Sequence, residues 1–216
     1  MSALADSGYQ LSFAELAYRS LRDQLVMLHI RPGEPINDDA LAQSFGFGRT
    51  PVREALKRLE SERLVVAYPR RGTFATEVNI ADLSHISEVR EQLEPTAATA
   101  AALRATSGDR AVLTGLVKEL SGKRTGPDAL MGLDMRVHRA IYATTHNPFL
   151  EDTLVRYDNL ATRIWCLFTD RLPDLAGHVS EHRPLLEAVI GGDAATASAL
   201  SAAHVAHFKA AIQAVL

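Results

Sequence analysis

The stretch FGFGRTPVREALKRL, residues 45–59, constrains the fold of this chain more than any other. A turn with two glycines, residues 46–48, precedes a helical pattern with one apolar face and one basic face. The apolar positions recur at i, i+4 and i+7: Val52, Leu56 and Leu59. We expect Thr50 to be the N-cap and Pro51 the first helical residue, where a missing N–H costs nothing.

The flanking segments complete a known arrangement. Leucine spacing predicts a helix over residues 13–28, and a second, short helix follows over 39–45, capped by Asn37 or Asp38. After the third helix, LVVAYPRRGTFAT predicts two strands joined by a cationic turn that contains glycine. Three helices and a hairpin in about 65 residues indicate a winged helix-turn-helix, whose third helix enters a DNA major groove.

The charge distribution supports a nucleic-acid partner. The whole chain has a net charge of −3, but residues 49–71 hold 7 basic side chains against 3 acidic ones. Arginine near a helix start reads guanine, and a glycine at a wing tip lets backbone approach DNA closely. A solvated helix face, paired with Glu54 and Glu60, is the alternative for Arg49, Arg53, Lys57 and Arg58. The DNA-binding candidates are Arg49, Thr50, Arg53, Lys57, Arg71 and Gly72.

After Glu77 the sequence carries only helical patterns. Six helices are expected, over residues 82–104, 109–120, 127–145, 149–171, about 178–190, and 194–215. Pro95 should kink or divide the first of them. The fold class is therefore mostly α, with a winged helix-turn-helix at residues 10–77 and an all-α antiparallel helical bundle at 80–216.

The composition indicates a cytoplasmic protein. One cysteine, Cys166, excludes a disulfide framework within the chain. The first residues lack a signal-peptide pattern, and no run approaches the ~20 apolar residues of a membrane span.

A metal site is the main candidate in the second domain. Asp134 and His138 lie one helical turn apart, and His182 and His204 are on the inward sides of two later helices. One carboxylate and three imidazoles suit a transition metal. Taken singly, each histidine is more often a surface or core residue than a ligand. His178 and His207 lie nearby in sequence and are not expected to be ligands.

The segment LAQSFGFGRTPVREALKRLESERLVVAYPRRGTFAT resembles the GntR family of bacterial transcriptional regulators. The resemblance implies that Arg49, Thr50 and Arg53 contact operator bases and phosphates and that Gly72 lies at the wing tip. Two departures stand out. Gly48 replaces the usual serine, and Asp38 and Asp39 occupy positions where some members carry a base-reading arginine.

The segments SEVREQLEPTAATAAALRAT and EHRPLLEAVIGGD resemble the FadR-type effector domain, or FCD domain, of that family. This implies that Asp134, His138, His182 and His204 bind a divalent metal: zinc, with nickel and manganese as alternatives. Six helices suggest the shorter, VanR-like subgroup. Arg90 is expected to bind an effector carboxylate beside the metal, unless it only pairs with Glu94. Arg163 is a second effector-binding candidate.

Together these features predict a regulator, a repressor in most of the family, that binds an inverted-repeat operator as a homodimer and responds to a small organic acid. Two alternatives remain at this stage. A metal-dependent hydrolase lacks an obvious general base here, and a constitutive DNA binder would leave the helical domain purely structural.

Overall fold

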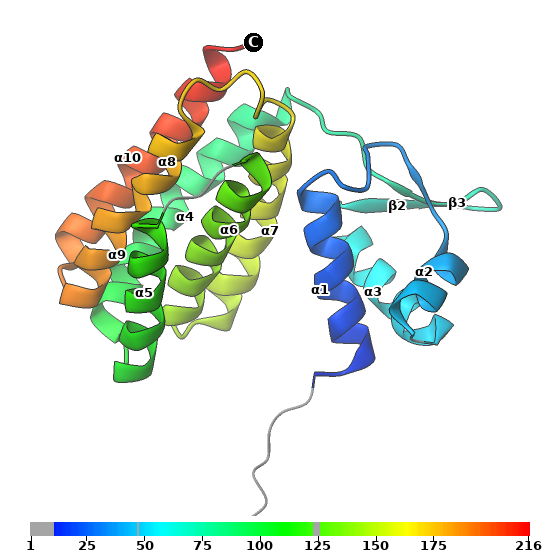
Figure 1. Ribbon diagram of the computed structural model, residues 1–216, viewed down its shortest axis with the longest axis horizontal. Helices are drawn as coiled ribbons and strands as arrows, with labels where there is room; N and C mark the ends of the chain where they lie inside the picture. Colours follow the sequence, from blue (N-terminus) through cyan, green and yellow to red (C-terminus); the bar gives the residue numbers. More distant parts are fainter. Residues whose placement is uncertain (1–10, 47, 123–125) are drawn as a thin grey trace, which may run out of the picture. The chain divides into compact units, whose positions relative to one another are not determined.

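The computed structural model describes residues 11–46, 48–122 and 126–216. The chain divides after Glu77 into two compact units (Figure 1). Residue 10 at the expected start of the first domain, Phe47 in the expected turn, and residues 123–125 in an expected break lie outside the described residues.

The first unit is a winged helix-turn-helix, as predicted. Its elements are α1 (Phe13–Val26), β1 (Pro35–Ile36), α2 (Asp38–Phe45), α3 (Arg49–Ser61), β2 (Val65–Tyr68) and β3 (Gly72–Ala75). Helices α1 and α3 pack against each other and share a core. Leu21 and Leu25 of α1 and Val52 and Leu59 of α3 are fully buried in that core. Burying such side chains stabilises the unit by about 1.5–3 kcal/mol each.

Two local predictions in this unit were wrong. Helix α3 begins at Arg49 with Gly48 as N-cap, and no side chain caps it, so Thr50 is already helical. Strand β1 was not predicted, since two residues are too few for a periodic pattern. It pairs antiparallel with β3, which makes β3 the central strand of the sheet.

The wing is a tight turn between β2 and β3. The Arg71 N–H donates to the Tyr68 carbonyl at 3.0 Å. Arg70 and Gly72 have φ angles of 64° and 96°. Only glycine adopts the second of these without strain, which explains the glycine at the end of the turn.

The second unit is all helical within the described residues. Its helices are α4 (Asp82–Arg104), α5 (Ser107–Leu120), α6 (Pro127–Thr144), α7 (Pro148–Cys166), α8 (Leu175–Ser180), α9 (His182–Gly191) and α10 (Ala194–Gln213). Helix α4 lies along α10 and also contacts α6, α7 and α9 (Figure 1). It runs through Pro95 without a break, so the proline does not divide it.

The expected helix over 178–190 is two helices in the structure. Glu181 separates them, because it is both the C-cap of α8 and the N-cap of α9. The subgroup expectation rested on a count of six helices, whereas the described residues of this unit form seven, so that count does not support the subgroup and the subgroup itself is untested. No helix of the described chain is long and apolar enough to cross a membrane.

Local signals fix the helices that carry the candidate site. Helix α9 ends at Gly192, whose φ of 76° suits a C-cap glycine. Helix α10 then starts at once, because the Asp193 carboxylate accepts a hydrogen bond from the Thr196 N–H at 3.0 Å. This short connection places His182 and His204 on adjacent helices.

Candidate functional site

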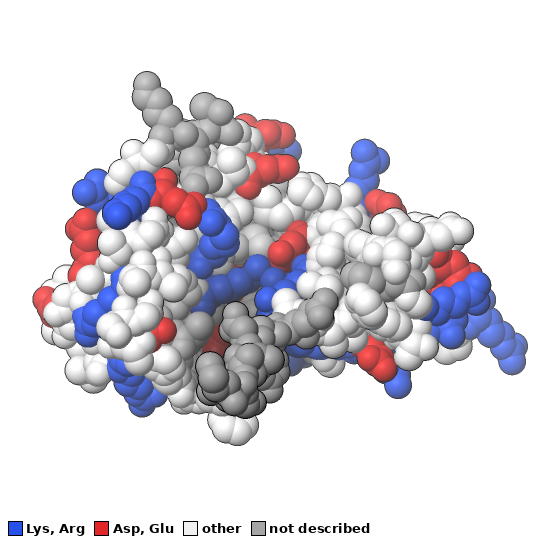
Figure 2. Space-filling model, turned by 60° about the horizontal axis from the view of Figure 1, so that its bottom comes forward, with Lys and Arg blue, Asp and Glu red and all other residues white. Residues whose placement is uncertain are grey.

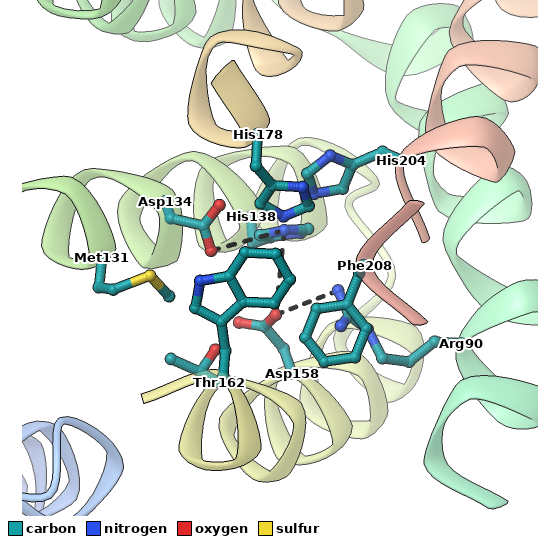
Figure 3. A pocket seen from close by; sticks show the side chains of 10 residues that line it. Arg90, Met131, Asp134, His138, Asp158, Thr162, His178, His204 and Phe208 are labelled. Carbon is teal, nitrogen blue, oxygen red and sulfur yellow. Dashed lines mark ion pairs between the residues drawn. The ribbon is translucent and has the colours of Figure 1, made fainter. Parts of the chain in front are cut away.

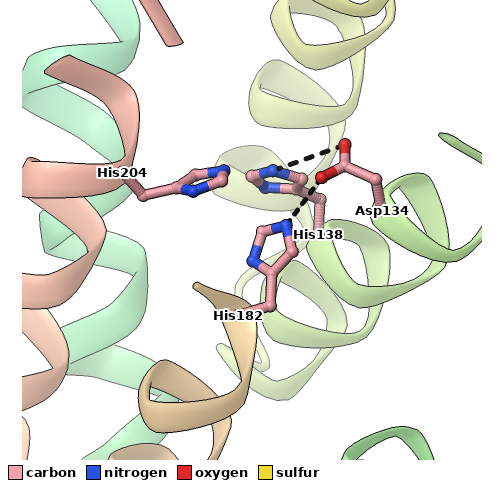
Figure 4. A group of neighbouring side chains, drawn as sticks. All are labelled: Asp134, His138, His182 and His204. Carbon is pink, nitrogen blue, oxygen red and sulfur yellow. Dashed lines mark hydrogen bonds and ion pairs between the residues drawn. The ribbon is translucent and has the colours of Figure 1, made fainter. Parts of the chain in front are cut away.

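The four expected metal ligands lie together in the helical unit. Asp134 and His138 extend from α6, His182 from the start of α9, and His204 from α10, and their side chains converge (Figure 4). One donor atom from each lies within 4.8 Å of the others. All four residues are at most 4% exposed, so their polar atoms face one another rather than solvent.

Hydrogen bonds orient two of the imidazoles. The Tyr142 hydroxyl donates to Glu94 at 2.6 Å and accepts from His138 Nδ1 at 3.0 Å. His204 Nδ1 donates to the Glu181 carboxylate at 2.9 Å. These assignments leave the Nε2 lone pairs of His138 and His204 for the cluster. Histidines that bind metals are usually held in this way, through a hydrogen bond from the other ring nitrogen.

Carboxylates next to the cluster favour the protonated form of His138. Burial alone would lower the pKa of His138, but the carboxylates of Asp158 and Glu94 outweigh it and raise that pKa to about 9. Burial likewise opposes ionisation of Asp134, yet the hydrogen bond from His182 and the charge on His138 lower its pKa. The donor set therefore fits a divalent cation, which would take the place of that proton.

Beside the cluster is a cavity of about 10 Å³, enough for roughly one water molecule. Its lining includes Arg90, Asp158, Trp165, His178 and Phe208 (Figure 3). An organic acid does not fit this volume unless side chains move.

Arg90 reaches the cavity but is already paired. Its guanidinium donates twice to Glu94, at 2.9 and 2.8 Å, and lies 3.3 Å from Asp158. The Phe208 ring lies against it, with 5.3 Å from the guanidinium carbon to the ring centre. The ion pair with Glu94, left open from the sequence, is thus present, and any effector carboxylate has to compete with it.

The other effector candidate is placed differently. Arg163 on α7 is 2% exposed and is not among the residues that line the cavity. The residues that sequence reasoning missed are Asp158 and Trp165. Asp158 and Thr162 stand one turn apart on α7 and both face the cavity, a spacing that could have drawn attention to this helix.

His178 also lies at the cavity, although its position in the sequence did not indicate a place in the site. Its ring stacks between Trp165 and His204, at centroid distances of 4.3 and 4.2 Å. Burial lowers its pKa to about 3 and lowers that of His204 well below the usual value. His207, by contrast, is half exposed.

The DNA-reading candidates are all exposed on the first unit. Arg49, Thr50, Arg53 and Lys57 lie on α3, and Arg71 and Gly72 lie at the β2–β3 turn. Figure 2 shows basic side chains at the end of the unit that carries this turn, on the right of the view. Asp38 and Asp39 pair with the arginines of α3: Arg53 Nε lies 2.8 Å from Asp38, and Arg49 Nε lies 2.6 Å from Asp39.

Arg58 belongs to the packing of the unit rather than to this basic face. Its guanidinium covers the Tyr18 ring at 3.6 Å. It also pairs with Glu15 at 3.0 Å and Glu62 at 3.3 Å. It therefore ties α3 to α1.

A winged helix with a basic third helix, followed in the same chain by a helical domain with a buried polar cluster, defines a DNA-binding regulator with a second, helical domain. Residues 13–75 match the family described as bacterial regulatory proteins, gntR family, and residues 85–207 match the FCD domain. The chain belongs to the GntR family of transcriptional regulators and carries an FCD domain.

A curated relative is similar in sequence along most of the chain, and solved structures are similar in fold. The galactonate operon transcriptional repressor of Escherichia coli (strain K12) is 29% identical over 208 residues, which cover 84% of this chain and 90% of the relative. The structure of E. coli McbR/YncC has a TM-score of 0.79 at 23% identity and covers 95% of this chain and 99% of that one. A GntR regulator from Rhodococcus sp. RHA1 has a TM-score of 0.69 at 17% identity, covering 95% and 100%. The protein is a transcriptional regulator rather than an enzyme.

Proposed function

We propose that this protein is a metal-dependent repressor that binds an inverted-repeat operator as a homodimer and responds to a small carboxylate. The observation that carries the proposal is the buried cluster of Asp134, His138, His182 and His204. A similar protein is named a galactonate operon repressor, which favours repression and an acidic effector for this chain too.

In this proposal α3 reads the operator. Arg49 and Arg53 contact base edges, while Thr50 and Lys57 contact phosphates. Because α3 has no side-chain cap, its first N–H groups are available to a phosphate as well. Arg71 and Gly72 bring the wing to the neighbouring groove. A dimer would place two such helices about one DNA turn apart.

The inner cluster, formed by Asp134, His138, His182 and His204, would hold zinc, or alternatively nickel or manganese. The metal would supply an open Lewis-acid position for a carboxylate oxygen. The ligands come from three helices, so metal binding orders α6, α9 and α10 relative to one another. Arg90 would bind the same carboxylate after giving up its ion pairs with Glu94 and Asp158. Arg163, which is buried on α7, would act as a supporting residue on that helix. We further propose that the protein acts in the cytoplasm.

An effector can act only if it binds two states of the protein with different affinity. The small cavity suggests what those states are. In one, Arg90 pairs with Glu94 and Asp158, as described above; in the other, the effector takes their place and α4 shifts against α7.

The test joins metal content to DNA binding. Native mass spectrometry of the purified protein would show the dimer, the metal and any retained acid together. Operator binding would then be measured by fluorescence anisotropy, before and after chelation, across a panel of hydroxy- and dicarboxylic acids. Equal operator affinity in every one of these conditions would refute a metal-dependent sensor.

A further inference from the structure

A second group of donor atoms surrounds Glu181, at the junction of α8 and α9. His178, Glu181 and His204 can each offer a ligand atom, all within 4.8 Å of one another. His207, one turn after His204 on α10, also reaches Glu181: its Nδ1 contacts carboxylate oxygen Oε1. Three imidazoles therefore approach a single carboxylate.

The two oxygens of Glu181 face different neighbours. Oε2 accepts the hydrogen bond of His204 Nδ1 at 2.9 Å and lies 3.5 Å from His178 Nδ1. Oε1 faces His207. Because each carboxylate oxygen carries two lone pairs, Glu181 can keep its hydrogen bond to His204 and still offer both oxygens to another partner.

His178 is the feature that an ordinary ion pair leaves unexplained. Its side chain is 5% exposed, and its Nδ1 atom is buried with no hydrogen-bond partner among the described residues. A buried polar atom without a partner costs about 1–3 kcal/mol. That nitrogen points toward Glu181 at 3.5 Å, which is too long for a hydrogen bond but close to the separation of two donors on one metal ion. Two donors at about 2.0–2.2 Å from zinc lie roughly 3 Å apart.

We infer that His178, Glu181 and His207 form a second divalent-metal site, on the Nδ1 side of His204. Its donor set, two imidazole nitrogens and a carboxylate oxygen, suits zinc and neighbouring transition metals. The site takes no ligand from the inner cluster of Asp134, His138, His182 and His204. It adjoins that cluster through the hydrogen bond between Glu181 and His204 and through the stacking of the His178 ring on His204.

This outer site differs from the inner one in access. His207 is 53% exposed and Glu181 33%, whereas the inner ligands are nearly all buried. Water can complete the coordination of an ion here, and the ion should bind more weakly and exchange faster than one in the inner cluster.

The test is the number of ions bound per chain. Chelator-treated protein would be titrated with zinc and the bound ions counted by native mass spectrometry, with a cobalt titration followed by absorption as an independent readout. Wild type should take two ions per chain, a tight one and a weaker one. His207→Ala, a substitution at an exposed position, should take only the tight one.

A matched control is available in His146, which is 48% exposed and is the one histidine that pairs with Asp109 among the described residues, at 2.8 Å. His146→Ala should still take two ions. A wild type that stops at one ion, or a His207→Ala protein that keeps two, would overturn the outer site.

Failure of the outer site can be told apart from failure of the proposed sensor. His182→Ala removes an inner ligand and leaves His178, Glu181 and His207 in place. If wild type binds one ion and His182→Ala none, the inner cluster stands and the outer site is wrong. If His182→Ala keeps the tight ion, the inner assignment is wrong instead.

Discussion

Arg49 Nε lies 2.6 Å from the Asp39 carboxylate, so the side chain expected to read DNA is held by an acid on the preceding helix. Both partners are more than half exposed. An exposed pair of this kind is worth only about 0–1 kcal/mol and weakens with salt. Guanine or phosphate can therefore replace Asp39 at little cost.

Arg49→Ala should cost operator binding about 1–3 kcal/mol and relax the preference at one base pair. Lys57→Ala should weaken binding to all DNA about equally, since a phosphate contact carries no sequence information. Anisotropy titrations on operator and scrambled DNA would separate the two effects. Unchanged operator affinity in Arg49→Ala would remove this residue from the reader.

Asp39→Asn tests what the acid does. Removing a negative charge beside the DNA face should strengthen binding to operator and to scrambled DNA alike, by roughly 0.5–1 kcal/mol at low salt. The comparison requires titrations at several salt concentrations. Weaker operator binding in this variant would mean instead that Asp39 orients Arg49 for base contact.

His138→Ala, His182→Ala and His204→Ala should each lose the tightly bound metal and the stability that it adds. That stabilisation is about 2.7 kcal/mol when free metal is at a hundred times its dissociation constant. Metal analysis and thermal melts, with and without added zinc, would measure both. His146→Ala should change neither. His178→Ala is a poor control, because its ring is buried between Trp165 and His204 and its loss leaves a cavity.

Arg90→Lys should keep the metal and operator affinity but lose tenfold to a hundredfold in effector affinity. Lysine keeps the charge but cannot make two parallel bonds to a carboxylate. Arg90→Ala is less informative, since it strands Glu94 and Asp158 as buried acids and should cost about 3–5 kcal/mol of stability. An acid that acts equally on wild type and Arg90→Lys would contradict the bridging role.

The stability of the metal-free protein should be greatest near pH 6.5. Burial lowers the pKa values of His178 and His204, so the stability they contribute is present above about 6.5 and is lost as the pH falls through their folded-state pKa values, about 3 for His178. His138 has a pKa raised to about 9, so its contribution is present below about 6.5 and is lost as the pH rises through 9. Urea unfolding of chelator-treated protein from pH 5 to 9 would measure this. Adding zinc should move the optimum to higher pH, because metal competes with the proton on His138.

The long periodic elements were predictable from the sequence, because a helix needs only a repeated apolar face and a start or stop signal. Local features were harder to predict. The capping preference of threonine placed the start of α3 two residues too late, since Gly48 can serve as N-cap without a side-chain bond. Strand β1 exists only because β3 lies beside it.

The candidate site also combines features that the sequence predicts with features that depend on tertiary contacts. The four residues proposed as inner ligands could be predicted from spacing and family resemblance, but the residues around them could not. His178 was set aside because no sequence pattern reports that Trp165 and His204 stack on both sides of it. The sequence places Arg58 on the basic face, although in the structure its half-exposed guanidinium covers the ring of Tyr18, forty residues earlier, and pairs with Glu15 of α1.

The burial of the four inner residues also bears on how fast a bound ion would exchange with solution. An ion enclosed by side chains that are at most 4% exposed can leave only when α9 or α10 opens away from α6. Openings of this kind are rare excursions whose frequency depends on local stability. The ion's residence would then depend on the protein rather than on momentary metal levels outside it. Under the proposed function, the regulator would keep its metal bound through many rounds of operator binding, and the concentration of the acid would be the variable that it reports.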